Sequence, residues 1–259
     1  MISEPALQRF LTRLLNRSML STVEQRAILD LDYRVSQFRA RTDIVVPGQH
    51  VEYACLVATG VAARFDQMRN GQRQITAFHI PGDMCDLHSV VAPTAAWGIS
   101  ALSACTILQV PHASLCAVID RYPKLSLVFW RDGTADSSVL AKWLGNIGRQ
   151  NARARLAHML CELGVRMEIA GLGSRHSFEM AISQEQLADA TGLTPVHVNR
   201  SLQRLRGEGL IGAQSHRFEI VEWDRLVAAA EFDPAYLLLR DSDHPVRSGM
   251  SQTAGAMAG

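Results

Sequence analysis

The stretch ISQEQLADATGLTPVHVNRSLQRLRGEGLI, residues 182–211, constrains the fold of this chain more than any other. Ser183 can cap a first helix, because a glutamine stands three residues later at the spacing of a capping box. Gly192 ends that helix, since glycine adopts positive φ angles without strain. Thr194 and Pro195 then supply an N-cap and a first helical residue. The stretch therefore predicts two short helices joined by a tight turn.

The second of these helices is predicted to bury only one narrow stripe. At about 100° per residue, Val198, Leu202 and Leu205 fall on the same side. The opposite face and its shoulders carry side chains that have no apolar partner of their own: Val196, His197, Asn199, Arg200, Gln203 and Arg204. Two β-like runs follow within residues 210–223, around a polar turn at residues 214–217.

Helix, glycine turn, capped helix and β-hairpin together predict a winged helix-turn-helix that binds double-stranded DNA. Arginine can pair with guanine in the major groove, glutamine or asparagine with adenine, and valine can contact a thymine methyl. A merely solvated helix face is the alternative, and we set it aside because the caps, turn and wing occur in the required order. Residues 142–217 hold ten Lys/Arg against six Asp/Glu, whereas residues 74–120 hold no Lys or Arg, so positive charge gathers in the same part of the chain.

The sequence shows no sign of export or membrane insertion. Arg9, Arg13 and Arg17 interrupt the N-terminal segment, which therefore lacks the apolar core of a signal peptide. No apolar run is long enough to span a membrane. The five cysteines are odd in number and irregularly spaced, so they do not form a disulfide framework. We expect a reduced, cytoplasmic protein with no membrane partner.

The N-terminal half alternates short apolar runs with turn signals. Residues 3–18 and 22–31 read as helices, and residues 33–111 as short strands separated by turns such as Pro47-Gly48 and Asn70-Gly71. Regular short strands of this kind predict a small antiparallel barrel or roll.

A long helix is predicted next, over residues 122–149. One stripe at a spacing of three and four residues contains Leu125, Val128, Asp132, Ala135, Val139 and Trp143. The helix could pack on its own roll, but we favour pairing with a second copy, with Asp132 as a polar residue that sets the register. A further helix is expected over residues 152–168. The domains are then 1–121 for the roll with its N-terminal helices, 122–150 for the dimerisation helix, 151–235 for the winged helix-turn-helix and 236–259 for a disordered tail.

This order of roll, long helix and winged helix-turn-helix resembles the CRP/FNR family of bacterial transcription regulators. The roll signature of that family appears as Gly60-Val61, Asn70-Gly71, Ile75 and Ile80-Pro81-Gly82-Asp83, and its recognition-helix signature begins at Gly192. The resemblance implies an α+β fold with an antiparallel β-roll like a cyclic nucleotide-binding domain. It also implies a homodimer on a palindromic DNA site, and it leaves RNA polymerase open as a further partner.

The same resemblance assigns DNA contacts residue by residue. Arg200 matches the arginine that reads a guanine, Val196 and Asn199 match other base-contacting positions, and Thr194 and His197 match backbone contacts. We add candidate phosphate contacts from the positive charge of the region: Arg149, Arg153, Arg155, His216 and Arg217.

The effector is not identified by the sequence. Members of this family that bind cyclic nucleotides carry a Gly-Glu pair after the Pro-Gly-Asp turn and later an Arg-Ser/Thr-Ala triplet, and both are missing here. No Lys or Arg stands between Arg73 and Arg121, so nothing in that segment neutralises a buried phosphate. This argues against cAMP and cGMP, unless a partner helix supplied a cation such as Arg131. The weakly indicated pocket residues are Cys85, Asp86, His88 and Ser100.

Other sensing chemistries receive less support. The iron–sulfur cluster of this family uses N-terminal cysteines, and none precedes Cys55. The spacing of His79, Cys85, His88 and His112 matches no known metal-binding motif, so no metal site is predicted, although a metal-, haem- or thiol-based redox or gas sensor of the same architecture stays open. Acidic neighbours should make Cys85 a poor redox thiol. A cupin-like enzyme is a remote alternative that lacks its His-x-His and Glu pattern, and no other catalytic motif is present, so we expect no enzyme activity.

Overall fold

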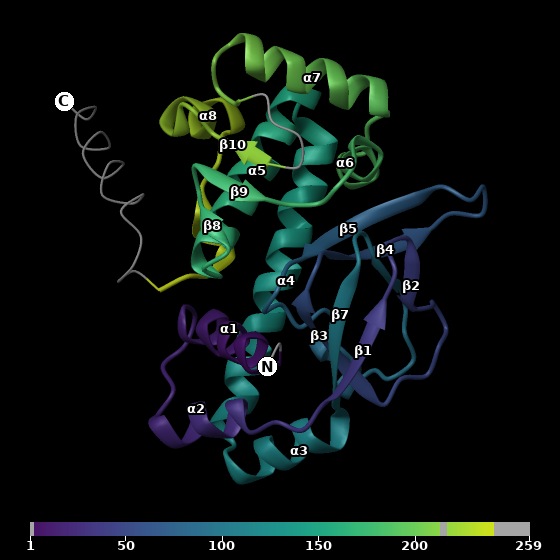
Figure 1. The fold of residues 1–259 in the computed structure, drawn as a ribbon, viewed down its shortest axis with the longest axis vertical. Helices are drawn as coiled ribbons and strands as arrows, with labels where there is room; N and C mark the ends of the chain where they lie inside the picture. Colours follow the sequence, from purple (N-terminus) through teal and green to yellow (C-terminus); the bar gives the residue numbers. More distant parts are fainter. Residues whose placement is uncertain (1–2, 213–216, 241–259) are drawn as a thin grey trace, which may run out of the picture.

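The computed structural model describes residues 3–212 and 217–240. Figure 1 shows one long vertical helix, α4, with the β-roll beside its lower half and the helices of the C-terminal part around its upper end. The N-terminal part consists of α1 (Ser3–Leu15), α2 (Thr22–Leu29), β1 (Arg34–Phe38), β2 (Thr42–Val45), β3 (Tyr53–Thr59), β4 (Ala62–Gln67), β5 (Arg73–His79), the 3-10 helix η1 (Leu87–Val90), β6 (Gly98–Ala101), β7 (Cys105–Pro111), α3 (His112–Arg121) and α4 (Lys124–Arg149). The C-terminal part consists of α5 (Ala152–Ile169), β8 (Gly173–Ser174), β9 (Ser177–Glu179), α6 (Gln184–Thr191), α7 (Pro195–Gly207), β10 (Arg217–Glu219), α8 (Trp223–Ala230) and the 3-10 helix η2 (Pro234–Leu237).

The predicted antiparallel roll is confirmed. Its strands form two sheets, one in the order β1-β7-β3 and one in the order β2-β6-β4-β5. The predicted turn at Asn70-Gly71 joins β4 to β5, and Gly71 adopts the positive φ of 84° that such a turn requires. Apolar side chains from both sheets, including Val57, Ile99 and Ile107, fill the space between them.

The winged helix-turn-helix is also confirmed, with a different sheet from the one that we expected. The two predicted runs meet only at a bridge between Ile211 and Ile220, and the expected turn at residues 214–217 lies largely outside the described residues. β10 pairs instead with β9, which in turn pairs with β8. These two strands come before α6 in the chain, and their few residues gave no alternating pattern to detect.

The face that we assigned to dimerisation on α4 is wrong. All six predicted side chains, Leu125, Val128, Asp132, Ala135, Val139 and Trp143, are buried against their own chain. Trp143, for example, stacks edge-on with Phe78 at the end of β5, with ring centroids 5.6 Å apart. The large apolar side chains that α4 leaves exposed are instead Leu127, Trp130, Leu140 and Leu144. A spacing of three and four residues marks a buried stripe, but it does not tell which surface buries it.

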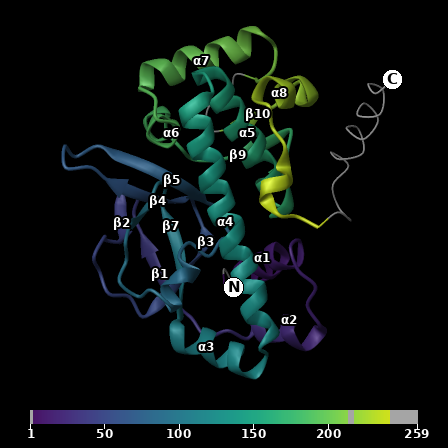
Figure 2. The ribbon, with the colours of Figure 1, turned by 180° about the vertical axis from the view of Figure 1, so that it is seen from behind.

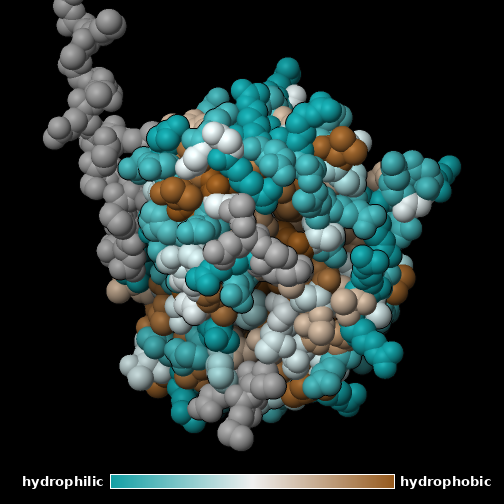
Figure 3. Space-filling view, turned by 45° about the horizontal axis from the view of Figure 1, so that its top comes forward, coloured by the Kyte–Doolittle hydropathy of each residue, from teal (hydrophilic) through white to brown (hydrophobic). Residues whose placement is uncertain are grey.

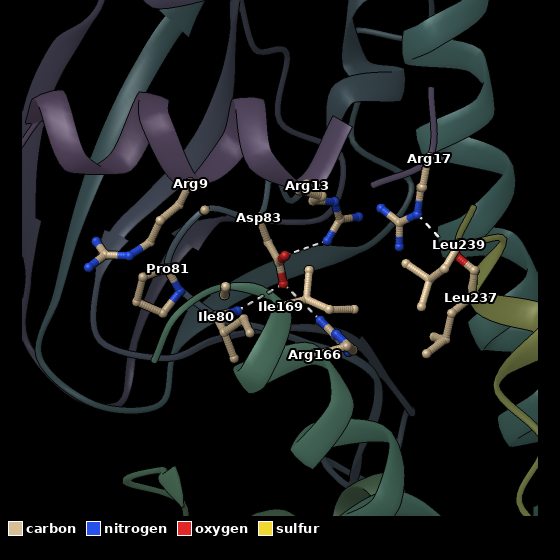
Figure 4. Close-up of a pocket in the computed structure, with 12 residues that line it drawn as sticks. Arg9, Arg13, Arg17, Ile80, Pro81, Asp83, Arg166, Ile169, Leu237 and Leu239 are labelled. Carbon is tan, nitrogen blue, oxygen red and sulfur yellow. Dashed lines mark hydrogen bonds and ion pairs between the residues drawn. The ribbon is translucent and has the colours of Figure 1, made fainter. Parts of the chain in front are cut away.

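Asp132 belongs to a buried cluster of charges that joins the two halves of the protein. Its Oδ1 accepts hydrogen bonds from Arg13 at 2.8 Å and Arg17 at 2.5 Å, both on or directly after α1. Asp83, in the turn after β5, lies between Arg13 and Arg166 of α5, and its Oδ2 is 2.7 Å from Arg166 (Figure 4). Burial opposes ionisation of Asp83, but the two guanidinium groups outweigh it and hold the pKa of that carboxyl well below its usual range.

The C-terminal boundary that we predicted is also wrong. Residues 236–240 pack on the protein, since Leu237 is buried, the Tyr236 hydroxyl donates to Glu162 at 2.9 Å and Arg17 donates to the Leu237 carbonyl at 3.0 Å. Seen from behind in Figure 2, this segment runs beside α4 toward α1. The rest of the predicted tail, residues 241–259, lies outside the described residues. No helix in the described part of the chain is long and apolar enough to cross a membrane.

Candidate nucleic-acid interface

The helix-turn-helix is held in shape by the local signals that its sequence contains. Ser183 and Gln186 form a capping box, with the Gln186 amide N–H donating to Ser183 Oγ at 3.2 Å. Gly192 ends α6 in the left-handed conformation, with a φ of 63°. Thr194 then caps α7, and its Oγ1 accepts from the His197 amide N–H at 3.3 Å. These contacts fix the angle at which α7 leaves the turn.

α7 has the two faces that we predicted. Val198, Leu202 and Leu205 are buried against α5 and α6. On the other side Val196 is 67% exposed, and Arg200 and Gln203 are exposed as well. Figure 3 looks toward the end of the molecule that carries α7, and the surface there is mostly hydrophilic. A helix anchored on one side and polar on the other has the shape that enters a major groove.

The residues that flank the exposed face of α7 are partly held by neighbouring side chains. Asn199 donates to Gln184 of α6 at 3.2 Å, and Arg204 pairs with Glu208 at 3.1 Å. Both side chains are exposed, so these contacts are in water and add little stability. Thr194 Oγ1 also lies 3.1 Å from His197 Nδ1, at the end of the helix that would approach the DNA backbone.

The candidate phosphate contacts divide into two groups. Arg149 and Arg217 are exposed, and Arg217 is held by a 2.8 Å hydrogen bond to Ser177 of β9. Arg153 and Arg155 instead have internal partners, and these are not what we expected. Arg153 forms an ion pair with Glu208, and Arg155 donates to the carbonyls of residues 150 and 191. His216 lies outside the described residues.

The predicted effector-pocket residues lie in different surroundings. Cys85 and Ser100 are buried, Cys85 in the apolar core of the roll and Ser100 on β6. Asp86 is buried beside β3, and its Oδ1 accepts from the Cys55 amide N–H at 2.6 Å. His88 is exposed and lines an apolar groove of about 500 Å³ between η1, α3 and α4. Burial raises the pKa of the Cys55 and Cys85 thiols, which keeps both protonated and slow to react.

The buried carboxyl of Asp86 should make the stability of the fold depend on pH. Its Oδ2 is buried and has no hydrogen-bond partner among the described residues, and burial raises the pKa of the carboxyl from 3.8 to about 6. The folded protein therefore holds this proton more tightly than the unfolded chain does. The stability that depends on Asp86 should rise as pH falls through about 6, by on the order of 2–3 kcal/mol, and level off below about 4.

Comparison with Asp86→Asn tests this expectation. His79 and His158 act in the opposite sense, because burial lowers the pKa of each to about 3 and the unfolded chain takes up their protons below pH 6.5. The wild-type curve alone would mix these effects. As the pH falls from 7 to 5, the melting temperature of wild type should rise relative to that of Asp86→Asn. A difference that stays constant over this range would contradict the assignment.

One charged residue of the β-roll was missed by sequence reasoning. Arg64, on β4, is buried with its Nε 3.1 Å from Thr76 Oγ1 and its guanidinium carbon 5.2 Å from the ring centre of Trp97. Residues 74–120 contain no Lys or Arg, so the sequence offers no cation within that segment to neutralise a buried phosphate. A strand pairs with neighbours that are distant in sequence, so counting charges within one segment overlooks a cation from the adjacent strand.

Among residues 3–212 and 217–240, no three His, Cys, Asp or Glu side chains are grouped to hold a metal ion.

The family model of the cyclic nucleotide-binding domain matches residues 35–122, and that of the Crp-like helix-turn-helix domain matches residues 154–229. The chain belongs to the CRP/FNR family of transcription regulators. This family consists of regulators and not of enzymes, which removes the cupin-like alternative.

Known relatives and structures agree with the membership. This CRP/FNR regulator is 28% identical to the nitrogen fixation regulation protein FixK of Azorhizobium caulinodans over 180 residues, which cover 70% of this chain and 72% of the relative. It is 23% identical to the transcriptional activator protein FnrL of Cereibacter sphaeroides, over 81% of this chain and 86% of the relative. The structure of FixK2 from Bradyrhizobium japonicum has the same fold, with a TM-score of 0.69 and 24% identity over 77% of this chain and 98% of that one.

Proposed function

We propose that this regulator binds DNA as a homodimer that places the two copies of α7 in successive major grooves of a two-fold symmetric site. The observation that carries the proposal is the free face of α7, where Val196, Arg200 and Gln203 are exposed opposite a buried apolar stripe. Arg200 has the length and the planar donor pair to bind N7 and O6 of a guanine. The half-site centres would lie about one helical turn, roughly 34 Å, apart.

The dimer contact is proposed on the exposed side of α4. Trp130, Leu140 and Leu144 are 73%, 38% and 70% exposed, and their separations of ten and four residues keep them on one side of the helix. Large apolar side chains gathered on one helix are costly to leave in water, and a second copy of the same helix can bury them all in an isologous contact.

One double variant tests both the proposed dimer contact and its contribution to DNA binding. Leu140→Asp/Leu144→Asp places two carboxylates on each side of the expected contact, so it should convert the protein to a monomer in light scattering. DNA binding should fall by at least about tenfold, because one recognition helix contacts only one half-site. Val23→Asp is the matched control, since this residue is 60% exposed on α2, outside α4, and should change neither property. A double variant that remains dimeric would reject this contact surface.

The signal that controls DNA binding is proposed to act through the β-roll, as an effector that the sequence does not identify. The connection between the two parts supports this, because Arg166 of α5 pairs directly with Asp83 of the roll. The amide nitrogen of Gln74, on β5, also donates to the carbonyl of Asp189 in α6 at 2.6 Å. A change in the conformation of the roll would therefore be transmitted to the DNA-binding domain through these contacts.

A further inference from the structure

Glu208, the residue directly after α7, binds arginine side chains from two different helices. Nε of Arg153, on α5, donates to both carboxylate oxygens, at 3.0 Å and 2.9 Å. Nε of Arg204, one turn earlier on α7, donates to one of the same oxygens at 3.1 Å. A third arginine, Arg225 of α8, donates to the backbone carbonyl of Glu208 at 3.4 Å. One carboxylate therefore holds two guanidinium groups at the end of α7.

These two guanidinium groups lie at the border of the face that α7 would present to DNA. Arg204 follows Arg200 by one helical turn, and its side chain is 70% exposed. Arg153 stands in the first turn of α5, and the start of α5 lies beneath α7 (Figure 1). Both side chains are thus where the backbone of a bound duplex would pass, and exposed arginines at such places are typical phosphate contacts.

The carboxylate of Glu208 opposes such phosphate contacts. The hydrogen bonds from Arg153, together with those from Arg204, hold the pKa of Glu208 below its usual range, so the group is negatively charged at neutral pH. A carboxylate repels phosphates, and a guanidinium that is already paired with it displaces fewer counterions from DNA. Sequence-independent binding depends almost entirely on this electrostatic contribution, so Glu208 should weaken it.

We propose that Glu208 is a specificity-determining residue, which withholds Arg153 and Arg204 from the DNA backbone and so weakens binding to sites that α7 does not read. This inference rests on the proposed docking of α7 in the major groove and deepens it. On the preferred site, base contacts fix the register of the protein, whereas on other sequences the protein can shift until free arginines meet phosphates. Withholding these arginines therefore costs more affinity on the wrong sites than on the right one.

Glu208→Gln tests the proposal, because it removes the charge and keeps the size of the side chain. Fluorescence anisotropy would compare the duplex that wild type selects from genomic fragments with a scrambled duplex of the same length and composition. Affinity of the variant for the scrambled duplex should rise about 5–10-fold in about 100 mM salt, with a salt dependence steeper by about one phosphate contact. Affinity for the selected duplex should rise less. Unchanged or weaker binding to the scrambled duplex, or an unchanged ratio of the two affinities, would overturn the proposal.

Glu168→Gln is the matched control, since it removes the same charge from a similar ion pair. Nε of Arg175 donates to Glu168 at 2.7 Å, and Glu168 lies 15 positions after Arg153 in the same helix, roughly 22 Å along its axis. This variant should bind the scrambled duplex as wild type does. An equal rise for Glu168→Gln and Glu208→Gln would mean that net charge alone is responsible, and the proposed role of Glu208 would be rejected.

Two further variants separate the charge of Glu208 from its contribution to the structure. Arg153→Gln leaves the carboxylate with Arg204 alone, so affinity for the scrambled duplex should fall below that of wild type. The double variant Arg153→Gln/Glu208→Gln removes one charge of each sign and should return to the wild-type affinity. A double variant that bound as weakly as Arg153→Gln would contradict the proposal. Equal binding of the two duplexes by wild type would contradict the proposed function instead, and the affinities of the four proteins for the scrambled duplex test Glu208 separately.

Discussion

Replacing Asp83 with alanine is expected to lower the free energy of unfolding by about 3–5 kcal/mol, the range for removing one partner of a buried ion pair. Asp83 is 4% exposed and lies between the guanidinium groups of Arg13 and Arg166, and it also accepts from the Ile80 amide N–H at 2.9 Å. Its loss would leave the Arg166 guanidinium with Glu162 as its one remaining carboxylate in the described chain. Urea unfolding of the purified variant measures the change.

A matched control separates burial from charge. Asp30→Ala removes the carboxylate of the Arg26–Asp30 pair, whose side chains are 74% and 55% exposed. This change should cost at most about 1 kcal/mol, since exposed ion pairs contribute little. If Asp83→Ala destabilised the protein no more than Asp30→Ala, the cluster would not be the link between the roll and the DNA-binding domain that its geometry suggests.

Arg200→Ala is expected to weaken binding to the preferred DNA site by about 1–3 kcal/mol for each half-site contact, and to relax discrimination at one base pair. The reason is that a bidentate contact to guanine distinguishes that base from the other three. Fluorescence anisotropy with duplexes that vary at each position of the half-site gives both quantities.

Arg217→Ala serves as the comparison for Arg200→Ala. Arg217 is exposed on β10 and is a candidate phosphate contact, so its loss should weaken binding equally for all sequences and reduce the salt dependence. If Arg200→Ala behaved in the same way as Arg217→Ala, α7 would bind the DNA without reading it.

The parts of this protein that sequence predicted well depend on neighbouring residues. The caps at Ser183 and Thr194 and the turn at Gly192 act within a few residues, so their spacing determines the helices that they bound. The buried and exposed faces of α7 follow from the same local periodicity. The sequence alone could therefore place the candidate DNA-contacting residues on the face of α7 that is exposed.

The parts that sequence predicted poorly depend on residues far apart in the chain. Asp132 on α4 was read as a residue at a dimer contact, but it pairs with Arg13, which is 119 positions away. Arg64 lies beside residues of the segment 74–120 only because β4 pairs with β5 and β6. β10 pairs with β9, which lies about 40 residues earlier in the chain. Periodicity identifies a face to be buried, and only the tertiary structure determines what covers it.

The central claim is that α7 of a dimer reads a two-fold symmetric DNA site, and selection of genomic fragments by the purified protein tests it most directly. Wild type and Arg200→Ala would be incubated with the same fragment pool, and the retained fragments sequenced. We predict that wild type enriches a two-fold symmetric motif with half-sites about one turn apart, and that the variant loses this enrichment. Enrichment of the same motif by both proteins would contradict the claim.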